Sequence, residues 1–194
     1  MNIGPAQVIP AAWIAFLLFW LISGFAAKRI ARRERRSGIV WRVGIGAVAA
    51  LLLSLAGNPR LGPLTLRFLP ETVRVAWTGT ALTVAGVLFA IWARVYLGRY
   101  WSSTVALKAD HQLIRSGPYA RIRHPIYTGI LLALAGTAIT VGRYAALLAF
   151  AIYLGAFWWK ARQEETLLAG QFGAAFEEHR RSTGFLLPRL SSPR

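Results

Sequence analysis

The chain has 194 residues, of which 56% are hydrophobic, with no cysteine and a formal net charge of +16. Its positive mean hydropathy is unusual for a soluble domain of this length and indicates a single membrane-embedded domain, residues 1–194. The lack of cysteine excludes disulfides, thiolate metal sites and cysteine nucleophiles. Most of the positive charge lies in alternate links between apolar runs, which argues against nucleic-acid binding.

Five apolar segments follow along the chain, at residues 8–27, 41–56, 73–97, 125–141 and 144–159. They predict an all-α integral membrane protein with about five transmembrane helices. The second segment closes at Gly57-Asn58-Pro59, a strong turn signal. Only Gly142-Arg143 separates the fourth segment from the fifth, so these two are predicted to form a short helical hairpin in the C-terminal half.

The basic residues indicate which way the chain crosses the membrane. They gather in the links 28–42 and 98–124 and in the tail 160–194, whereas the links 58–71 and 141–143 carry only Arg60, Arg67 and Arg143. Loops rich in lysine and arginine stay in the cytoplasm. We therefore expect the N-terminus outside and the C-terminus in the cytoplasm. If the source is prokaryotic, the membrane would be the plasma or inner membrane. A re-entrant fourth and fifth segment would leave the same faces cytoplasmic.

The two ends of the chain carry further signals. The first apolar run precedes its basic cluster, so we expect a retained helix and not a cleaved signal peptide. In the tail, Leu168, Phe172 and Phe176 recur every four residues among charged side chains. This pattern predicts a cytoplasmic amphipathic helix that lies on the membrane or folds over the cytoplasmic mouth, ending near Gly184.

The link before the fourth segment is the densest in functional side chains. Gly117 to Gly129 holds two glycines, two prolines, two tyrosines, two arginines and a histidine. Arg123-His124-Pro125 stands where this link enters a helix, and a helix N-terminus stabilises an anion. Arg123 and His124 would add charged donors. A plain helix cap with basic side chains at the membrane interface explains the same residues, and the tripeptide alone leaves both open.

Glu164-Glu165 is the second candidate, since the chain has only seven acidic residues. The pair could receive a cationic ligand, an amine or a proton. It could also be a solvated pair that offsets Lys160 and Arg162 on the same helix.

Three other polar residues carry weaker signals. Arg94 lies inside the third apolar run, where an ionisable side chain faces a cavity, pairs with another group or reaches the interface. His111 and His179 are isolated, and they are typical of surface residues. No metal site is expected, because the histidines and acids lack ligand spacing.

Residues 94–190 resemble the isoprenylcysteine carboxyl methyltransferase family and its relatives, the integral-membrane phospholipid methyltransferases. The order and spacing of several short motifs carry the resemblance, and these are His111-Gln112-Leu113, Gly117-Pro118-Tyr119, Arg123 to Gly129, Glu164-Glu165, Leu168, Phe172-Gly173 and Pro188. The resemblance implies an S-adenosylmethionine-dependent enzyme without a Rossmann domain. It also implies a cytoplasmic cofactor pocket between the link, the hairpin ends and the C-terminal helix.

Carried onto this chain, the family pattern assigns roles residue by residue. Arg94, Arg123 and Glu164 are candidates for ordering the reacting group of the acceptor. The cofactor-pocket candidates are His111, Leu113, Tyr119, His124, Pro125, Tyr127 and Glu165. Residues 94–194 would form the cofactor-binding core, and residues 1–93 would supply scaffold helices and the acceptor tunnel.

The chain departs from the family at a few positions. Phe176 and His179 stand where the family often has tyrosine, and Lys160 stands where it often has arginine one turn before the glutamates. Lysine cannot bind a carboxylate through two parallel hydrogen bonds as arginine does. This departure weakens the case for the carboxyl acceptor of the founding members.

The expected function is methyl transfer to a lipophilic acceptor at the bilayer, with O-methylation of an isoprenylcysteine-type carboxylate favoured. N-methylation of a phospholipid amine is the alternative. An NADPH-dependent membrane reductase and a non-catalytic membrane accessory protein are further alternatives. The expected partners are the lipid bilayer and the acceptor, with no nucleic acid, and the sequence does not indicate an oligomeric state.

Overall fold

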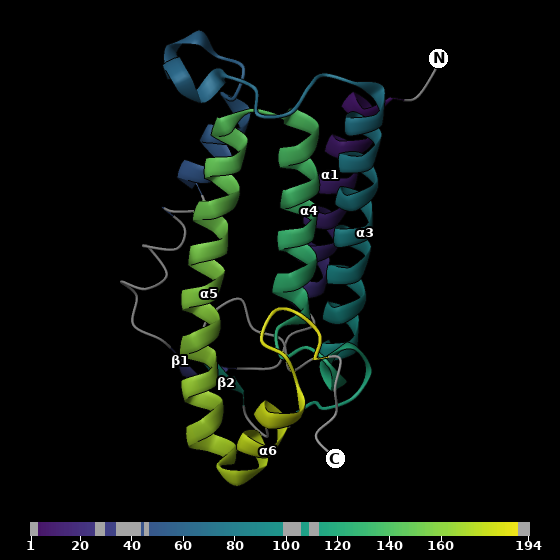
Figure 1. The fold of residues 1–194 in the computed structure, drawn as a ribbon. Coiled ribbons are helices and arrows are strands. Elements are labelled where there is room, and N and C mark those ends of the chain that lie inside the picture. The colour runs from purple at the N-terminus through teal and green to yellow at the C-terminus, as the bar shows by residue number, and fades with distance from the viewer. Residues whose placement is uncertain are drawn as a thin grey trace.

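The computed structural model describes residues 4–25, 30–33, 44, 47–98, 106–108 and 113–189. Four long helices run along one axis, and these are α1 (Pro5–Phe25), α3 (Val73–Leu97), α4 (Pro125–Val141) and α5 (Tyr144–Phe172) (Figure 1). Helices α1, α3 and α5 are long and apolar enough to cross a membrane, and α4 is a shorter apolar helix. The helical membrane fold is therefore confirmed, although the span count of five is not.

The predicted second span is described only in part. Residues 47–54 are helical and end in a turn at residues 55–57, as the turn signal predicts. Residues 41–43 and 45–46 of that span lie outside the described residues.

Local chemistry explains where the helices begin and end. The Thr72 hydroxyl accepts a hydrogen bond from the backbone N–H of Val75 at 3.3 Å, which caps the start of α3. Pro125 opens α4, where its missing N–H costs nothing. Gly142 ends α4 in the left-handed conformation, with φ of 64°, and α5 begins two residues later. The predicted tight hairpin is therefore confirmed.

Helices α3 and α4 are in backbone contact along a seam of glycines. A Cβ on Gly86 would lie 2.3 Å from the backbone nitrogen of Ala133, and one on Gly136 would lie 2.4 Å from the carbonyl oxygen of Gly79. Gly129 approaches the backbone of α3 in the same way. Small residues allow this approach, and dispersion between two backbones then stabilises the pair in a medium as apolar as the side chains. The sequence analysis missed this seam.

Buried hydroxyl groups tie α1 to the seam. The Thr83 hydroxyl donates to the Gly79 carbonyl at 2.9 Å and lies 3.3 Å from the Thr137 hydroxyl. The Trp13 indole N–H of α1 donates to that same Thr137 hydroxyl at 3.0 Å. Phe16 is buried between these helices. Helix α1 therefore packs on the α3–α4 pair through both a hydrogen bond and a ring.

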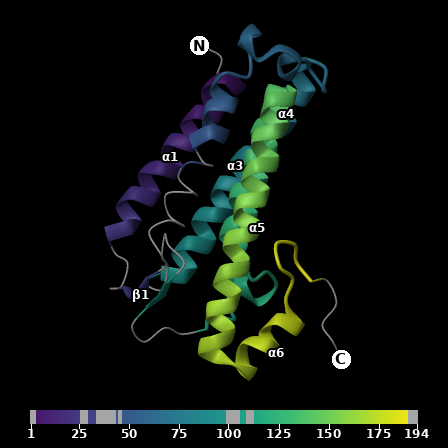
Figure 2. The ribbon, with the colours of Figure 1, turned by 90° about the vertical axis from the view of Figure 1, so that its left-hand side faces the viewer.

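A short 3-10 helix, η1 (Pro59–Thr65), covers the hairpin turn at the end of the bundle opposite α6 (Figure 2). The segment that follows η1 pairs with the turn, because Phe68 donates its N–H to the Gly142 carbonyl at 2.9 Å. Tyr144 in turn donates its N–H to the Leu66 carbonyl at 3.1 Å. These bonds satisfy backbone groups that the end of α4 leaves open.

The structure adds two features that the helical prediction did not contain. Strands β1 (Ile30–Arg33) and β2 (Ala106–Lys108) form a small antiparallel ribbon, with Arg33 opposite Ala106 and Ile30 opposite Lys108. The predicted terminal helix is present as α6 (Ala174–Ser182), but Gly173, with φ of 48°, separates it from α5. Leu168 and Phe172 therefore belong to α5 and Phe176 to α6, so the expected four-residue stripe does not run along one helix.

Replacing Gly86 with alanine should destabilise the protein, because the new Cβ would meet the α4 backbone at 2.3 Å. Overpacking of this kind costs about 1–3 kcal/mol. Thermal unfolding in detergent measures the effect. Gly155→Ala on α5 is the matched control, because nothing lies within 4 Å of its Cβ. Equal melting temperatures for the two variants would contradict the seam.

Candidate functional site

A buried ion pair joins the start of α4 to α5. The Arg123 Nε donates to Glu165 Oε1 at 2.6 Å, and His124 Nε2 lies 3.3 Å from that same oxygen. The side chains of Arg123 and Glu165 are only 11% and 8% exposed. A charge-assisted hydrogen bond with so little access to water is among the stronger polar contacts in a protein. One carboxylate oxygen of α5 therefore holds two consecutive side chains of the link.

The neighbouring carboxylate makes a second set of contacts. The Tyr127 hydroxyl donates to Glu164 Oε1 at 2.6 Å, and the Lys160 Nζ lies 3.8 Å from this oxygen. His124 Nδ1 lies 3.6 Å from Glu164 Oε2. The Nδ1 atom of His124 thus faces Glu164, and its Nε2 atom faces Glu165. Glu164 is 22% exposed, so it is the more accessible acid of the pair.

Aromatic rings build one wall beside these acids. The Tyr127 ring stacks on His124 with centroids 5.5 Å apart and on Phe157 with centroids 4.9 Å apart. The Lys160 Nζ lies 5.1 Å from the centre of the Tyr127 ring. A cation is attracted to the face of an aromatic ring. Carboxylates and ring faces together suit a positively charged ligand.

The C-terminal segment pairs with the link by backbone hydrogen bonds. Arg123 donates its N–H to the Gly184 carbonyl at 2.9 Å, and His124 donates to the Phe185 carbonyl at 3.3 Å. Gly184 donates in return to the Arg121 carbonyl at 3.0 Å. These bonds satisfy donors at the start of α4 that would otherwise need water.

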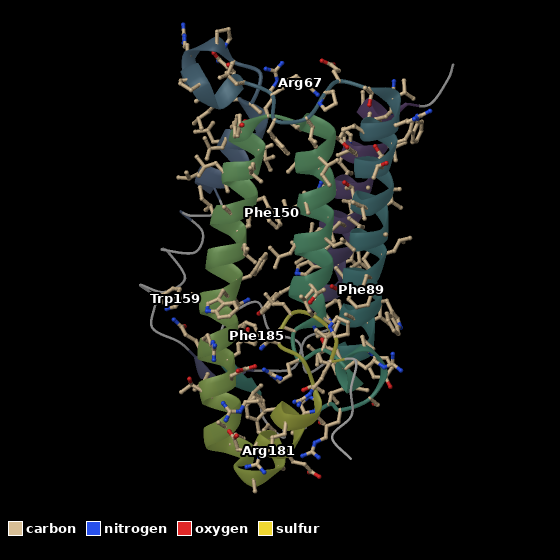
Figure 3. All side chains as sticks on the ribbon, in the orientation of Figure 1. Arg67, Phe89, Phe150, Trp159, Arg181 and Phe185 are labelled. Atoms are coloured by element: carbon tan, nitrogen blue, oxygen red, sulfur yellow. The ribbon has the colours of Figure 1, made fainter. Side chains whose placement is uncertain are left out.

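Two side chains reinforce this pairing. Arg123 Nη1 donates to the Thr183 and Arg180 carbonyls, so its guanidinium joins α5, α6 and the C-terminal segment. The Thr128 hydroxyl on α4 donates to the Leu186 carbonyl at 2.6 Å. Figure 3 shows the result, with Phe185 lying between α4 and α5.

The other residues selected from the sequence lie around this cluster. Pro125 is buried as the first residue of α4. Tyr119 is also buried, its hydroxyl donates to the Ala93 carbonyl at 3.4 Å, and burial raises the pKa of the phenol above its ordinary value. Leu113 is half-buried at the start of the described link. His111 lies outside the described residues.

Arg94 makes a different contact from the one expected of a substrate-ordering cation. Its two terminal nitrogens donate to backbone carbonyls, Nη1 to Gly98 at 2.8 Å and Nη2 to Ser23 at 2.7 Å. The Arg94 guanidinium therefore ties the end of α3 to α1.

His179 of α6 is buried, although the sequence suggested a surface residue. Burial lowers the pKa of His179 to about 4, and the nearby positive charges of Arg115 and Arg123 act in the same direction. Arg115 also pairs with Glu178 at 2.9 Å, which holds α6 against the link. The imidazole is therefore neutral near pH 7.

Several residues of the site were missed by the sequence analysis. Phe157 precedes Glu164 by seven residues, so it shares one face of α5 with that glutamate. That spacing was a usable signal. Thr183 and Phe185 had no such signal, because they reach the site by long-range backbone pairing.

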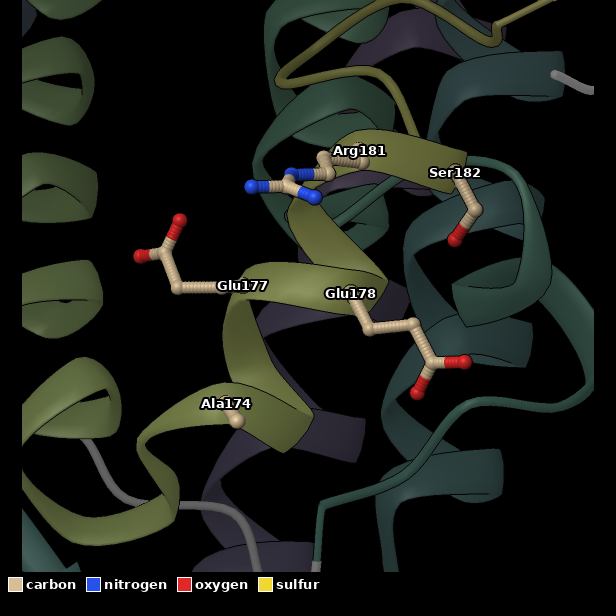
Figure 4. Close-up of a pocket in the computed structure, with 5 residues that line it drawn as sticks. All are labelled: Ala174, Glu177, Glu178, Arg181 and Ser182. Carbon is tan, nitrogen blue, oxygen red and sulfur yellow. The ribbon is translucent and has the colours of Figure 1, made fainter.

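A shallow pocket of about 420 Å³ lies on α6, lined by Ala174, Glu177, Glu178, Arg181 and Ser182 (Figure 4). None of its lining residues belongs to the Glu164–Glu165 cluster. In the part of the chain that the structure describes, no group of three or more histidines and acids could hold a metal ion.

Comparison with known proteins connects this geometry to a family. The sequence model of the isoprenylcysteine carboxyl methyltransferase family matches residues 79–170, a range that contains Arg123, His124, Tyr127 and both glutamates. The chain is therefore similar to the isoprenylcysteine carboxyl methyltransferase family over just under half of its length. The resemblance drawn from the sequence motifs is thereby confirmed.

Individual relatives agree with the match to the family model. The protein-S-isoprenylcysteine O-methyltransferase of Schizosaccharomyces pombe is 33% identical over 101 residues, which cover 50% of this chain and 43% of that protein. The cobalt-zinc-cadmium resistance protein CzcN of Cupriavidus metallidurans is 32% identical over 157 residues, covering 78% of this chain and 63% of that protein. The chain thus spans about half the length of the curated relatives it matches.

A solved structure supports the fold. The structure of the eukaryotic intramembrane Ras methyltransferase ICMT superposes with a TM-score of 0.52 at 21% sequence identity. The match covers 75% of this chain and 52% of that one. The likeness in space therefore covers more of the chain than residues 79–170, which the family model matches.

Removing the Glu165 carboxylate should destabilise the site end of the bundle. Glu165→Ala leaves the buried Arg123 guanidinium without its counter-ion, and breaking a buried pair in this way costs about 3 kcal/mol. Hydrogen exchange should accelerate at the amides of Gly184 and Arg189, which donate to the Arg121 carbonyl. Glu177→Ala, in an exposed pair with Arg180, is the control and should change little. Unchanged hydrogen exchange at these two amides in Glu165→Ala would show that the Arg123–Glu165 pair does not hold the C-terminal segment.

The stability of the protein should fall on acidification because of His179. Its pKa of about 4 in the folded state lies below the ordinary value of 6.5, so the unfolded chain binds more protons between these values. The stabilisation is complete above pH 6.5 and is lost as the pH falls towards 4. Melting temperatures at pH 7.5 and 5 measure this loss, and His179→Phe should show a smaller loss than the wild type. An equal loss in both proteins would exclude His179 as the cause.

Proposed function

We propose that this chain is an S-adenosylmethionine-dependent membrane methyltransferase with a lipophilic acceptor. The observation that carries the proposal is the cluster of His124, Tyr127, Glu164 and Glu165 at one end of an apolar bundle. A polar cofactor reaches such a site from water, and a lipid-like acceptor reaches it from the bilayer. The match of residues 79–170 to the family model supports the same chemistry.

The residues present fit a cofactor that carries two positive centres, a sulfonium and an ammonium. The face of Tyr127 already attracts the Lys160 ammonium at 5.1 Å, so this wall of the site favours cations. Glu164 keeps 22% of its side chain exposed and offers a carboxylate to an ammonium group. S-adenosylmethionine, when bound, supplies an electrophilic methyl group.

The other site residues are proposed to hold this arrangement. Glu165 is 8% exposed and already engaged by Arg123 and His124, so it positions the imidazole and the start of α4. Arg123 secures the C-terminal segment instead of touching substrate, and Arg94 secures the ends of α3 and α1. We propose that Tyr119, Pro125, Leu113 and His111 complete the cofactor pocket.

The favoured acceptor is the carboxylate of an isoprenylcysteine-type lipid. A carboxylate needs no base to accept a methyl group; it needs orientation and the exclusion of water. Lys160 is 12% exposed beside Tyr127 and Glu164, and it is the cation nearest to orienting such a group. We propose that the helices before residue 94 shape the acceptor tunnel.

A phospholipid amine is the second candidate acceptor. The observation that favours it is the accessible Glu164 carboxylate, which could take up the proton that an amine loses on methylation. The Arg123 guanidinium, by contrast, already donates hydrogen bonds to Glu165 and to the Arg180 carbonyl, so it is poorly placed to bind the carboxylate of a substrate.

The site end of the bundle is proposed to face the cytoplasm, with the N-terminus outside. The described residues at this end include Arg115, Arg121, Arg180, Arg181 and Arg189, whereas Arg60, Arg67, Arg74 and Arg143 lie at the η1 end. This asymmetry follows the positive-inside bias of membrane proteins.

Calorimetric titration with S-adenosylhomocysteine tests the proposal. The wild type should bind, and both Glu164→Gln and Tyr127→Phe should weaken binding about tenfold, the equivalent of one charged hydrogen bond. Glu71→Gln is the matched control, because Glu71 is 83% exposed and lies at the opposite end of the bundle. Folded wild-type protein that binds no S-adenosylhomocysteine would refute the function and favour an accessory role.

Transfer of a radiolabelled methyl group then distinguishes the two acceptors. Farnesylcysteine should yield a product whose label is released as methanol in base, because it is an ester. Phosphatidylethanolamine would yield a base-stable amine. Base-stable label alone would replace the carboxylate proposal with the amine.

A further inference from the structure

Arg162 has a peculiar environment for a cation on α5. Its guanidinium lies 5.1 Å from the centre of the Trp158 ring and 5.2 Å from the centre of the Phe185 ring. Trp158 and Phe185 are themselves in edge contact, with centroids 4.8 Å apart. We call these two rings the aromatic platform. The platform links α5 to the C-terminal segment, and Arg162 is exposed above it.

No carboxylate in the described part of the chain forms an ion pair with Arg162. The contrast with its neighbours is clear. Lys160 is 12% exposed and faces Glu164, whereas Arg123, which approaches the same Phe185 ring at 5.7 Å, is neutralised by Glu165. Among the described residues, the positive charge of Arg162 therefore has no carboxylate partner beside the platform.

Among the described residues, the Arg162 guanidinium contacts the two rings, and none of its N–H donors forms a hydrogen bond. These N–H donors lie in the plane of the guanidinium, where they form a fork. That fork matches the two oxygens of a phosphate or carboxylate. The platform thus orders a long side chain in advance and lowers the entropy lost when an anion binds.

The position of Arg162 along α5 indicates that its ligand comes from the membrane surface. Exposed tryptophans Trp158 and Trp159 follow the apolar part of α5, and exposed Trp92 and Tyr96 occupy the same end of α3. Figure 3 shows Trp159 on α5 level with Phe89 on α3, one turn before Trp92. Tryptophan and tyrosine gather at the headgroup level of a bilayer. Arg162 lies one helical turn beyond Trp158, which is the level of lipid phosphates.

We propose that Arg162, held on the aromatic platform, binds the phosphate of an anionic membrane lipid. The site lies beside the candidate cofactor cluster, because Phe185 also contacts His124 with ring centroids 5.1 Å apart. A lipid bound there would pack against the C-terminal segment that pairs with the start of α4. This proposal concerns a binding site outside the methyl-transfer chemistry and does not depend on it.

Native mass spectrometry of the full chain in detergent tests the site. Titration with dioleoylphosphatidylglycerol should show one bound lipid favoured over dioleoylphosphatidylcholine. Arg162→Gln should weaken phosphatidylglycerol binding about tenfold and leave phosphatidylcholine binding unchanged. Arg162→Lys should fall between, because it keeps the charge and loses the fork.

Arg181→Gln is the matched control, since Arg181 is an exposed arginine on α6, outside the platform. Its phosphatidylglycerol affinity should equal that of the wild type. An equal loss in Arg181→Gln, or no loss in Arg162→Gln, would overturn the site. Glycerol 1-phosphate that bound as tightly as the lipid would overturn the lipid assignment in favour of a soluble phosphate. S-adenosylhomocysteine binding measured on Arg162→Gln should match the wild type, which separates this test from that of the proposed function.

Discussion

The ion pair between Arg123 and Glu165 organises the functional end of this protein. It joins residues 42 positions apart, at a donor–acceptor distance of 2.6 Å and with little access to water. Through its Nη1 donor, the same guanidinium also holds the carbonyls of Thr183 and Arg180. A buried charge is costly unless it is paired and hydrogen-bonded, so these three contacts together offset the cost of burying the guanidinium. The position of His124 and the path of the C-terminal segment both follow from this contact.

The scaffold supplies a rigid partner for that contact. Helices α3 and α4 touch through glycines, so α4 cannot slide or rotate without a backbone clash. The turn after α4 is held by the segment that follows η1, at the far end of the bundle. The contacts with α3 and the hydrogen bonds at the turn after α4 therefore fix the position of α4, including its start at His124 and Pro125. The two glutamates come from α5, which contacts α4 much less extensively than α3 does.

The two glutamates differ in what the fold lets them do. Glu165 is consumed by contacts within the protein, whereas Glu164 keeps an accessible oxygen beside an aromatic wall. Adjacent residues on a helix point about 100° apart, so one can anchor the structure while the other faces a ligand. Lys160 and Arg162 show the same division on the preceding turn. Lys160 faces the acids, and Arg162 lies on the outer rings.

The sequence by itself determined the membrane class, most helix boundaries and the residues of the motif. Hydropathy is a property of one segment, and Thr72, Pro125 and Gly142 begin or end a helix through their own backbone and side chain. Residues close together in the sequence were therefore sufficient to predict these features. Only the tertiary structure decided the glycine seam, the burial of His179, the bend at Gly173 and the pairing of Gly184 with Arg121. Each of these depends on which surfaces meet after the helices pack, and no local pattern encodes that choice.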